Sequence, residues 1–184
     1  MASPESICNR ALQHLGASRI VSLTQDTPNA RECNALYEEV RDRELRRNNW
    51  SFAIKRASMP ALAAAPPFGF ARKFQLPSDC LKLIRENNVD WTVEGRELLT
   101  DDGAPLNIRY VQQVTDPNTM DVLFREALAA AIAFDLCERL TQSNTKKDAA
   151  GRIYTATVAE ARRVNAIEKP PEALAVGAWE LARL

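Results

Sequence analysis

The hydrophobic period of this chain changes twice, and these changes constrain the fold more than any other feature. Residues 1–49 and 116–168 carry apolar side chains at helical spacing, whereas residues 50–115 hold short runs with the period of strands. The pattern predicts an α+β fold: an antiparallel helix bundle built from both chain ends, completed by a helical hairpin over 116–168, with an inserted small antiparallel β region and an extended C-terminal tail over 169–184. At 184 residues we expect one domain overall.

Start and stop signals place the helices. Ser3 with Pro4, and Thr27 with Pro28, are each a capping residue followed by a proline at the first helical position. The third segment is apolar nearly all round, which is typical of a helix packed on more than one side. The four predicted helices cover residues 3–16, 27–48, 121–140 and 145–167.

The middle of the chain carries strand and turn signals. We expect strands in "WSFAIKRA", "FARKFQL", "LPSDCLKLI", "WTVEGRELLT" and "PLNIRYVQQV". Glu94-Gly95 is predicted to be a two-residue hairpin turn, and Asp102-Gly103 the next turn.

Charge and cysteine content exclude several classes of protein. Lys plus Arg equals Asp plus Glu at 24 each, so no global field draws the protein onto DNA or an anionic membrane. The longest apolar run, "ALAAAIAF", is too short to span a bilayer. No signal peptide is apparent and the cysteines are widely spaced, so we expect synthesis in a reducing cytoplasm and small core cysteines at Cys8, Cys33, Cys80 and Cys137.

The sequence contains none of the common enzyme motifs. His14 is the single histidine, and no phosphate-binding or nucleophile motif occurs. Carboxylate pairs at Glu94 with Glu97 and at Asp101 with Asp102 leave open a glycosidase-like pair, although acidic residues are also common in turns. We expect no catalytic residue, no metal and no cofactor.

The stretch "EEVRDRELRR" raises the question of nucleic-acid binding. Its four acidic and four basic residues cancel, and Glu39 with Arg43, and Asp42 with Arg46, have the spacing of ion pairs along a helix. We therefore expect a solvated helix face that ends in a buried anchor at Trp50, with Lys55 and Arg56 beyond it lacking nearby acids. In the third helix, we expect Asp135 to pair with Arg139.

Five segments in order, "ICNRALQHLG", "NNWSFAIKRA", "FQLPSDCLKL", "VEGRELLTDDGAPLNIRYV" and "DPNTMDVLFREALAAAIAFDLCERLTQS", resemble the head-to-tail adaptor proteins of short-tailed bacteriophages, also called tail tubular protein A. The resemblance covers nearly the whole chain. It implies a structural virion protein of the tail neck, made in the host cytoplasm, that forms a ring, a dodecamer, between the portal protein and the tail nozzle protein. DNA would pass through the ring with only transient, non-specific contact.

Partner-binding residues are expected in two places. The charges of the second helix would lie at subunit contacts or the lumen, or else form plain solvated surface. The apolar tail residues would dock on the portal or a neighbouring subunit, or else fold back on their own bundle. The candidates are Arg41, Arg43, Arg46 and Arg47, with Glu39 and Asp42, and in the tail Trp179, Leu181 and Leu184.

Two other functions remain open at this point. A virion-associated glycan hydrolase, acting on cell wall or exopolysaccharide, would need Glu94 or Glu97. A free DNA-binding regulator would show salt-sensitive duplex binding. For the adaptor, we expect a largely monomeric isolated protein and ring formation templated by the portal.

Overall fold

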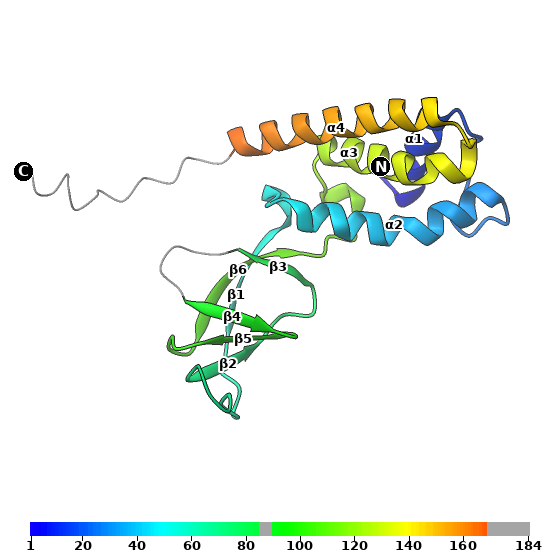
Figure 1. Cartoon of the computed structure of the whole chain (residues 1–184). Coiled ribbons are helices and arrows are strands. Elements are labelled where there is room, and N and C mark those ends of the chain that lie inside the picture. Colours follow the sequence, from blue (N-terminus) through cyan, green and yellow to red (C-terminus); the bar gives the residue numbers. More distant parts are fainter. Residues whose placement is uncertain (85–89, 169–184) are drawn as a thin grey trace, which may run out of the picture.

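The computed structural model describes residues 1–84 and 90–168, which form four α-helices and two three-stranded antiparallel sheets, an α+β fold. Figure 1 shows the helices gathered at one end, with the strands below the C-terminal half of α2. We call residues 1–49 and 116–168 the helical part, and residues 50–84 and 90–115 the β part. The elements are α1 (Pro4–Leu15), α2 (Pro28–Arg47), β1 (Ile54–Met59), β2 (Arg72–Gln75), β3 (Cys80–Ile84), β4 (Trp91–Glu94), β5 (Glu97–Thr100), β6 (Leu106–Gln112), α3 (Val122–Thr141) and α4 (Asn144–Ile167).

The predicted helix starts are confirmed by their capping contacts. Ser3 Oγ accepts from the backbone N–H of Ser6 at 3.2 Å, and Ser6 Oγ accepts from the N–H of Ser3 at 2.9 Å, a reciprocal capping box. Gly16 ends α1 with φ of 68°. Thr27 caps α2 by accepting from the N–H of Ala30. Local chemistry therefore fixes where these helices begin.

α3 is the central element, as predicted from the apolar side chains that surround its axis. It packs against α1, α2 and α4, and its buried side chains include several alanines that allow the neighbouring helices to approach closely. α4 approaches α3 closely at Gly151, where a Cβ atom would lie 3.3 Å from Cε2 of Phe134.

The two sheets have strand orders β1-β6-β3 and β2-β5-β4. β6 contributes to both hydrophobic cores, because Val111 is buried in the core of the helical part and Leu106 in the smaller core of the β part. Side chains alternate across a strand, so residues 106 and 111 point to opposite faces of the sheet. This strand ties the two parts together.

The β4–β5 turn differs from the prediction by one residue. Glu94 and Glu97 are directly paired, so the two turn residues are Gly95 and Arg96 rather than Glu94 and Gly95. Gly95 has φ of 60°, which a type II′ turn requires at its first central position. The backbone conformation, rather than the acidic residue, sets the turn.

Three of the cysteines are core residues, as expected, and Cys80 is half-buried. A hydrogen bond with Cys33, together with burial, raises the pKa of Cys8 and keeps its thiol protonated. Among the described helices, none has the length and apolar character that crossing a bilayer demands.

Candidate functional site

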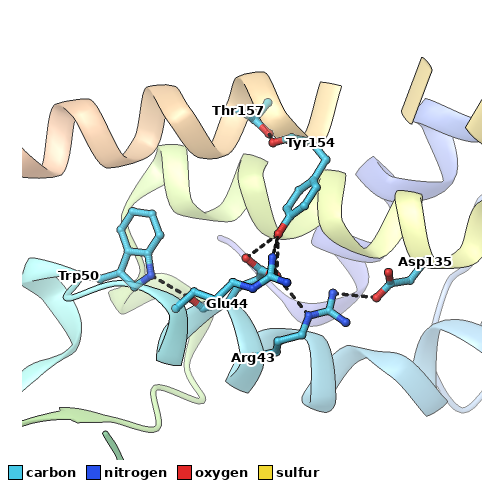
Figure 2. Close-up of polar contacts among 7 residues, drawn as sticks. Arg43, Glu44, Trp50, Asp135, Tyr154 and Thr157 are labelled. Atoms are coloured by element: carbon cyan, nitrogen blue, oxygen red, sulfur yellow. Dashed lines mark hydrogen bonds and ion pairs between the residues drawn. The ribbon is translucent and has the colours of Figure 1, made fainter. Parts of the chain in front are cut away.

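The charged stretch of α2 leads to a buried polar cluster between three helices. Figure 2 shows Glu44 of α2 at its centre, with Tyr154 of α4 above it. The Glu44 side chain is 3% exposed. The Tyr154 hydroxyl lies 3.0 and 3.1 Å from its two carboxylate oxygens, Arg43 Nε lies 3.3 Å away and Arg47 Nη1 3.2 Å away. A buried carboxylate needs such partners because desolvation disfavours an isolated charge.

Arg43 extends the cluster to α3. Its Nη2 lies 2.8 Å from Asp135 Oδ2, as Figure 2 shows. Burial works to lower the pKa of Arg43, but the hydrogen bond and charge of Asp135 outweigh it and the pKa is raised. Two guanidinium groups and two carboxylates thus meet here, and their formal charges cancel. We call Arg43, Glu44, Arg47, Asp135 and Tyr154 the Glu44 cluster.

The two predicted ion pairs within single helices, Glu39 with Arg43 and Asp135 with Arg139, are both wrong. Arg43 reaches across to α3 instead of bonding Glu39, and Asp135 receives that guanidinium instead of the one at Arg139. Arg139 pairs with Glu32 of α2 at 3.0 Å. Contacts between helices outcompete these helix-local pairs because each bridges two packed elements that already hold the side chains in place.

Tyr154 joins the cluster to the apolar core. The Arg47 guanidinium lies 5.9 Å from the centre of its ring and also bonds its hydroxyl, and the ring stacks on Phe134 at 6.1 Å. Burial and the negative charge of Glu44 raise the pKa of Tyr154. The hydroxyl is therefore held protonated as a donor.

Arg41 and Glu44 correct the expectation of a solvated helix face. The side chain of Arg41 is 4% exposed, its Nε lies 2.8 Å from Asp42 Oδ1, and its guanidinium carbon sits 5.9 Å from the centre of the Tyr37 ring. Asp42 does not pair with Arg46 as predicted, because its second oxygen accepts from Gln113 at 2.6 Å. This face of α2 is an internal interface.

Arg46 and Lys55 connect to the β part. Arg46 is exposed and donates to the backbone carbonyl of Leu81 in β3. Lys55 does have an acidic partner, contrary to expectation: its Nζ lies 2.9 Å from Asp79, which also accepts from the Tyr110 hydroxyl at 3.0 Å. These two donors outweigh partial burial and lower the pKa of Asp79.

Trp50 is the buried anchor that the sequence predicts. It is 3% exposed, and its Nε1 donates to the backbone carbonyl of Glu44 at 2.9 Å (Figure 2). Its ring packs edge-on against Phe124 at 5.0 Å and stacks on Phe52 at 6.3 Å. The chain therefore leaves α2 and enters the β part from a fixed point.

The candidate carboxylates of the β hairpin lie apart from this cluster. Glu94 is exposed, and Glu97 is bound through both oxygens to Lys73 Nζ, at 3.2 and 3.0 Å. Asp101 accepts from the N–H of Ala71 at 2.7 Å, a contact between two distant loops rather than the local turn bond expected of such residues. Within residues 1–84 and 90–168, no group of three or more His, Cys, Asp or Glu side chains could hold a metal ion.

The predicted site residues have unequal outcomes. Arg43, Arg46 and Arg47 keep exposed surface while bonding within the chain, and Arg41 is buried. Trp179, Leu181 and Leu184 lie outside the described residues. Glu44 and Tyr154, which centre the cluster, were not predicted. A signal existed for Glu44, because it follows the apolar Tyr37 and Val40 at helical spacing.

Comparison with known proteins adds no family: no family model and no curated protein matches the chain.

Proposed function

We propose that this protein is a structural virion protein, a head-to-tail adaptor of a short-tailed bacteriophage. It would form a ring between the portal and the tail nozzle. The resemblance of five ordered segments, from "ICNRALQHLG" to "DPNTMDVLFREALAAAIAFDLCERLTQS", is the observation that carries the proposal. In this proposal the four helices act as an antiparallel bundle against the portal, and the β part points toward the nozzle.

The polar chemistry of the described residues supports a role in contact rather than catalysis. The Glu44 cluster, whose central carboxylate is buried, joins α2, α3 and α4. Its carboxylates already accept hydrogen bonds from tyrosine and arginine. An adaptor needs such rigidity, because a closed ring of identical subunits tolerates little variation in protomer shape.

Surface charge on α2 supports lateral contacts. Arg43 and Arg47 keep 37% and 45% of their side-chain surface exposed while anchored to Glu44. A guanidinium that is already oriented loses less entropy when it binds a carboxylate of a neighbouring subunit. In the ring, these arginines and Arg46 would face a neighbour or the lumen.

Purified protein and purified portal rings from a short-tailed phage provide the test. We expect light scattering to give a monomer for the protein alone, and a ring bound to the portal after mixing. A stable ring without portal would contradict templating but not the adaptor role. Absence of any complex with the portal would contradict the adaptor role.

The glycan hydrolase remains the alternative, with weaker support. Glu94 is exposed and Glu97 is ion-paired with Lys73, so neither carboxyl has the water-excluding surroundings of a general acid. Cleavage of cell-wall or exopolysaccharide glycan that disappears in Glu94→Gln or Glu97→Gln, with folding intact, would favour the hydrolase over the adaptor.

A further inference from the structure

A groove lies between the edge strands of the two sheets. β3 is an edge of its sheet and β4 is an edge of the other, and a cavity of about 360 Å³ is lined by residues of both. In Figure 1 the two strands follow one another along the chain and lie one above the other. Its apolar lining includes Leu76, Leu83 and Val93, and its basic lining is Arg46, Lys82 and Arg96.

The backbone of β4 offers hydrogen-bonding groups to this groove. A two-residue hairpin turn is closed by a hydrogen-bonded pair, here Glu94 with Glu97. Hydrogen-bonded and non-hydrogen-bonded pairs alternate along antiparallel strands, so Thr92 bonds Leu99, and Val93 does not bond β5. The N–H and carbonyl of Val93 therefore point away from β5, toward the open edge.

Neighbouring edges are already occupied at comparable positions. On β2, the outward carbonyl of Lys73 accepts from the N–H of Leu62 at 2.8 Å. On β3, the carbonyl of Leu81 accepts from Arg46. In the described part of the chain, no hydrogen bond from another segment reaches the backbone of Val93. The edge of β4 that borders this groove is thus one at which an added strand gains new hydrogen bonds.

The charge of the groove favours an acidic strand as its ligand. The groove is lined by three basic side chains, and none of its lining residues is acidic. A second copy of this protein pairing through its own β4 would bring its Lys82 and Arg96 against the same cations, which disfavours that contact. An acidic strand meets complementary charge on the rim and apolar surface at Val93, which is 40% exposed.

We propose that this groove binds an extended acidic segment of a partner protein, which adds as a strand to the open edge of β4. Alternate side chains of that segment would be apolar, to cover Val93 and Leu83, and acidic, to meet Lys82 and Arg96. This binding mode goes beyond the adaptor proposal and does not depend on it.

The test measures fluorescence anisotropy of the full chain with a labelled probe peptide, EVTVEVE. We expect the basic peptide KVTVKVK to bind about tenfold more weakly or not at all. A form of EVTVEVE with N-methylated amides should also lose binding, because it keeps the side chains and removes the donors that a strand needs.

Variants locate the site. Lys82→Glu should weaken binding of EVTVEVE about tenfold, whereas Arg56→Glu, the same charge change on exposed β1 surface outside the groove, should leave it unchanged. Val93→Pro removes only an outward N–H, which an edge strand tolerates, and should abolish binding. Val93→Thr keeps the N–H and should change affinity by no more than about twofold. Circular dichroism checks that each variant is folded.

Three results would overturn the proposal: no binding of EVTVEVE, equal binding of the N-methylated peptide, or equal loss in Lys82→Glu and Arg56→Glu. Binding of a single-stranded oligothymidylate at Lys82 in place of the peptide would also overturn it, because the cations would then serve phosphate groups. The N-methylated peptide uses the unaltered protein, so the test holds even if Val93→Pro does not fold.

Discussion

The helical part and the β part reach stability by different routes. The helical part has a continuous core that runs through all four helices and includes Trp50, and a buried polar cluster crosses it. The β part has its own small core, whose buried apolar residues are Met59, Phe74, Leu76, Leu98 and Leu106. Small sheets with so little buried surface are marginal by themselves. The β part therefore depends on the helices, through Val111 of β6.

The polar networks of the two parts differ in how well water is excluded from them. In the helical part Tyr154 donates to a carboxylate that is 3% exposed, and in the β part Tyr110 donates to Asp79, which is 31% exposed. The same hydrogen bond is worth more where water cannot replace it. The helical part is therefore the more rigid of the two, whereas the β part opens at lower energetic cost.

Matched core truncations should separate the two parts most strongly. Phe124→Ala, at a residue with no exposed surface in the helical core, should cost about 3–5 kcal/mol and lower protection throughout the molecule. Phe74→Ala, equally buried, should expose mainly β2, β4 and β5 while α3 keeps its slow exchange. Hydrogen exchange measures both. Uniform loss of protection in Phe74→Ala would show that the two parts unfold as one unit.

Removing the charge of Glu44 should give the next largest effect. Glu44→Gln should destabilise the protein by about 2 kcal/mol, because buried donors lose a charged acceptor, and the partial exposure of Arg43 and Arg47 limits the loss. Urea unfolding measures it. Exposed Glu39→Gln is the control, and an equal change in both variants would contradict a special role for Glu44.

Removing the hydroxyl of Tyr154 or of Tyr110 tests the two hydrogen-bond networks separately. Tyr154→Phe should cost about 1.5 kcal/mol and Tyr110→Phe about 1 kcal/mol, since both lose a bond to a carboxylate but only Glu44 is nearly free of water. Chemical denaturation at neutral pH gives both values. A larger loss for Tyr110→Phe would reverse the ranking of the two networks.

Mild acid should give the smallest effect and act on the helical part. Burial, with help from nearby Arg10, lowers the pKa of His14 below its ordinary value of 6.5. The unfolded chain therefore binds a proton at His14 more tightly than the folded protein does. The stability that neutral His14 contributes to the folded state is complete above pH 6.5 and is lost as the pH falls below it. Urea midpoints at neutral pH and at about pH 5 measure the loss, and His14→Gln should reduce it.

Asp79 in the β part responds only at lower pH. Its pKa lies below the ordinary 3.8, so its contribution is complete above pH 3.8 and is lost as the pH falls through the lower folded value. Exchange protection of β1, β3 and β6 should therefore be unchanged by mild acid. Loss of that protection in the pH range where His14 titrates would contradict this separation.

The sequence predicts what is local and misses what depends on docking. Ser3, Thr27 and Gly16 act on their own helix, so their positions could be inferred and are confirmed. The partners of Arg43 and Asp135 could not be inferred, because the helical period shows which face is buried but not which residue lies opposite. The turn at Gly95 was predicted one residue too early, because composition alone does not show which residues of the two strands are paired.

Gly151 has an evolutionary consequence. Glycine inside α4 costs about 1 kcal/mol relative to alanine in helix propensity, which ordinarily makes it easy to replace. Here even a methyl group would sit 3.3 Å from the Phe134 ring, which stacks on Tyr154, and Tyr154 is hydrogen-bonded to Glu44. Mutational drift at residue 151 is therefore coupled to drift at residue 134: a lineage can acquire a larger residue at one position only as the other yields space.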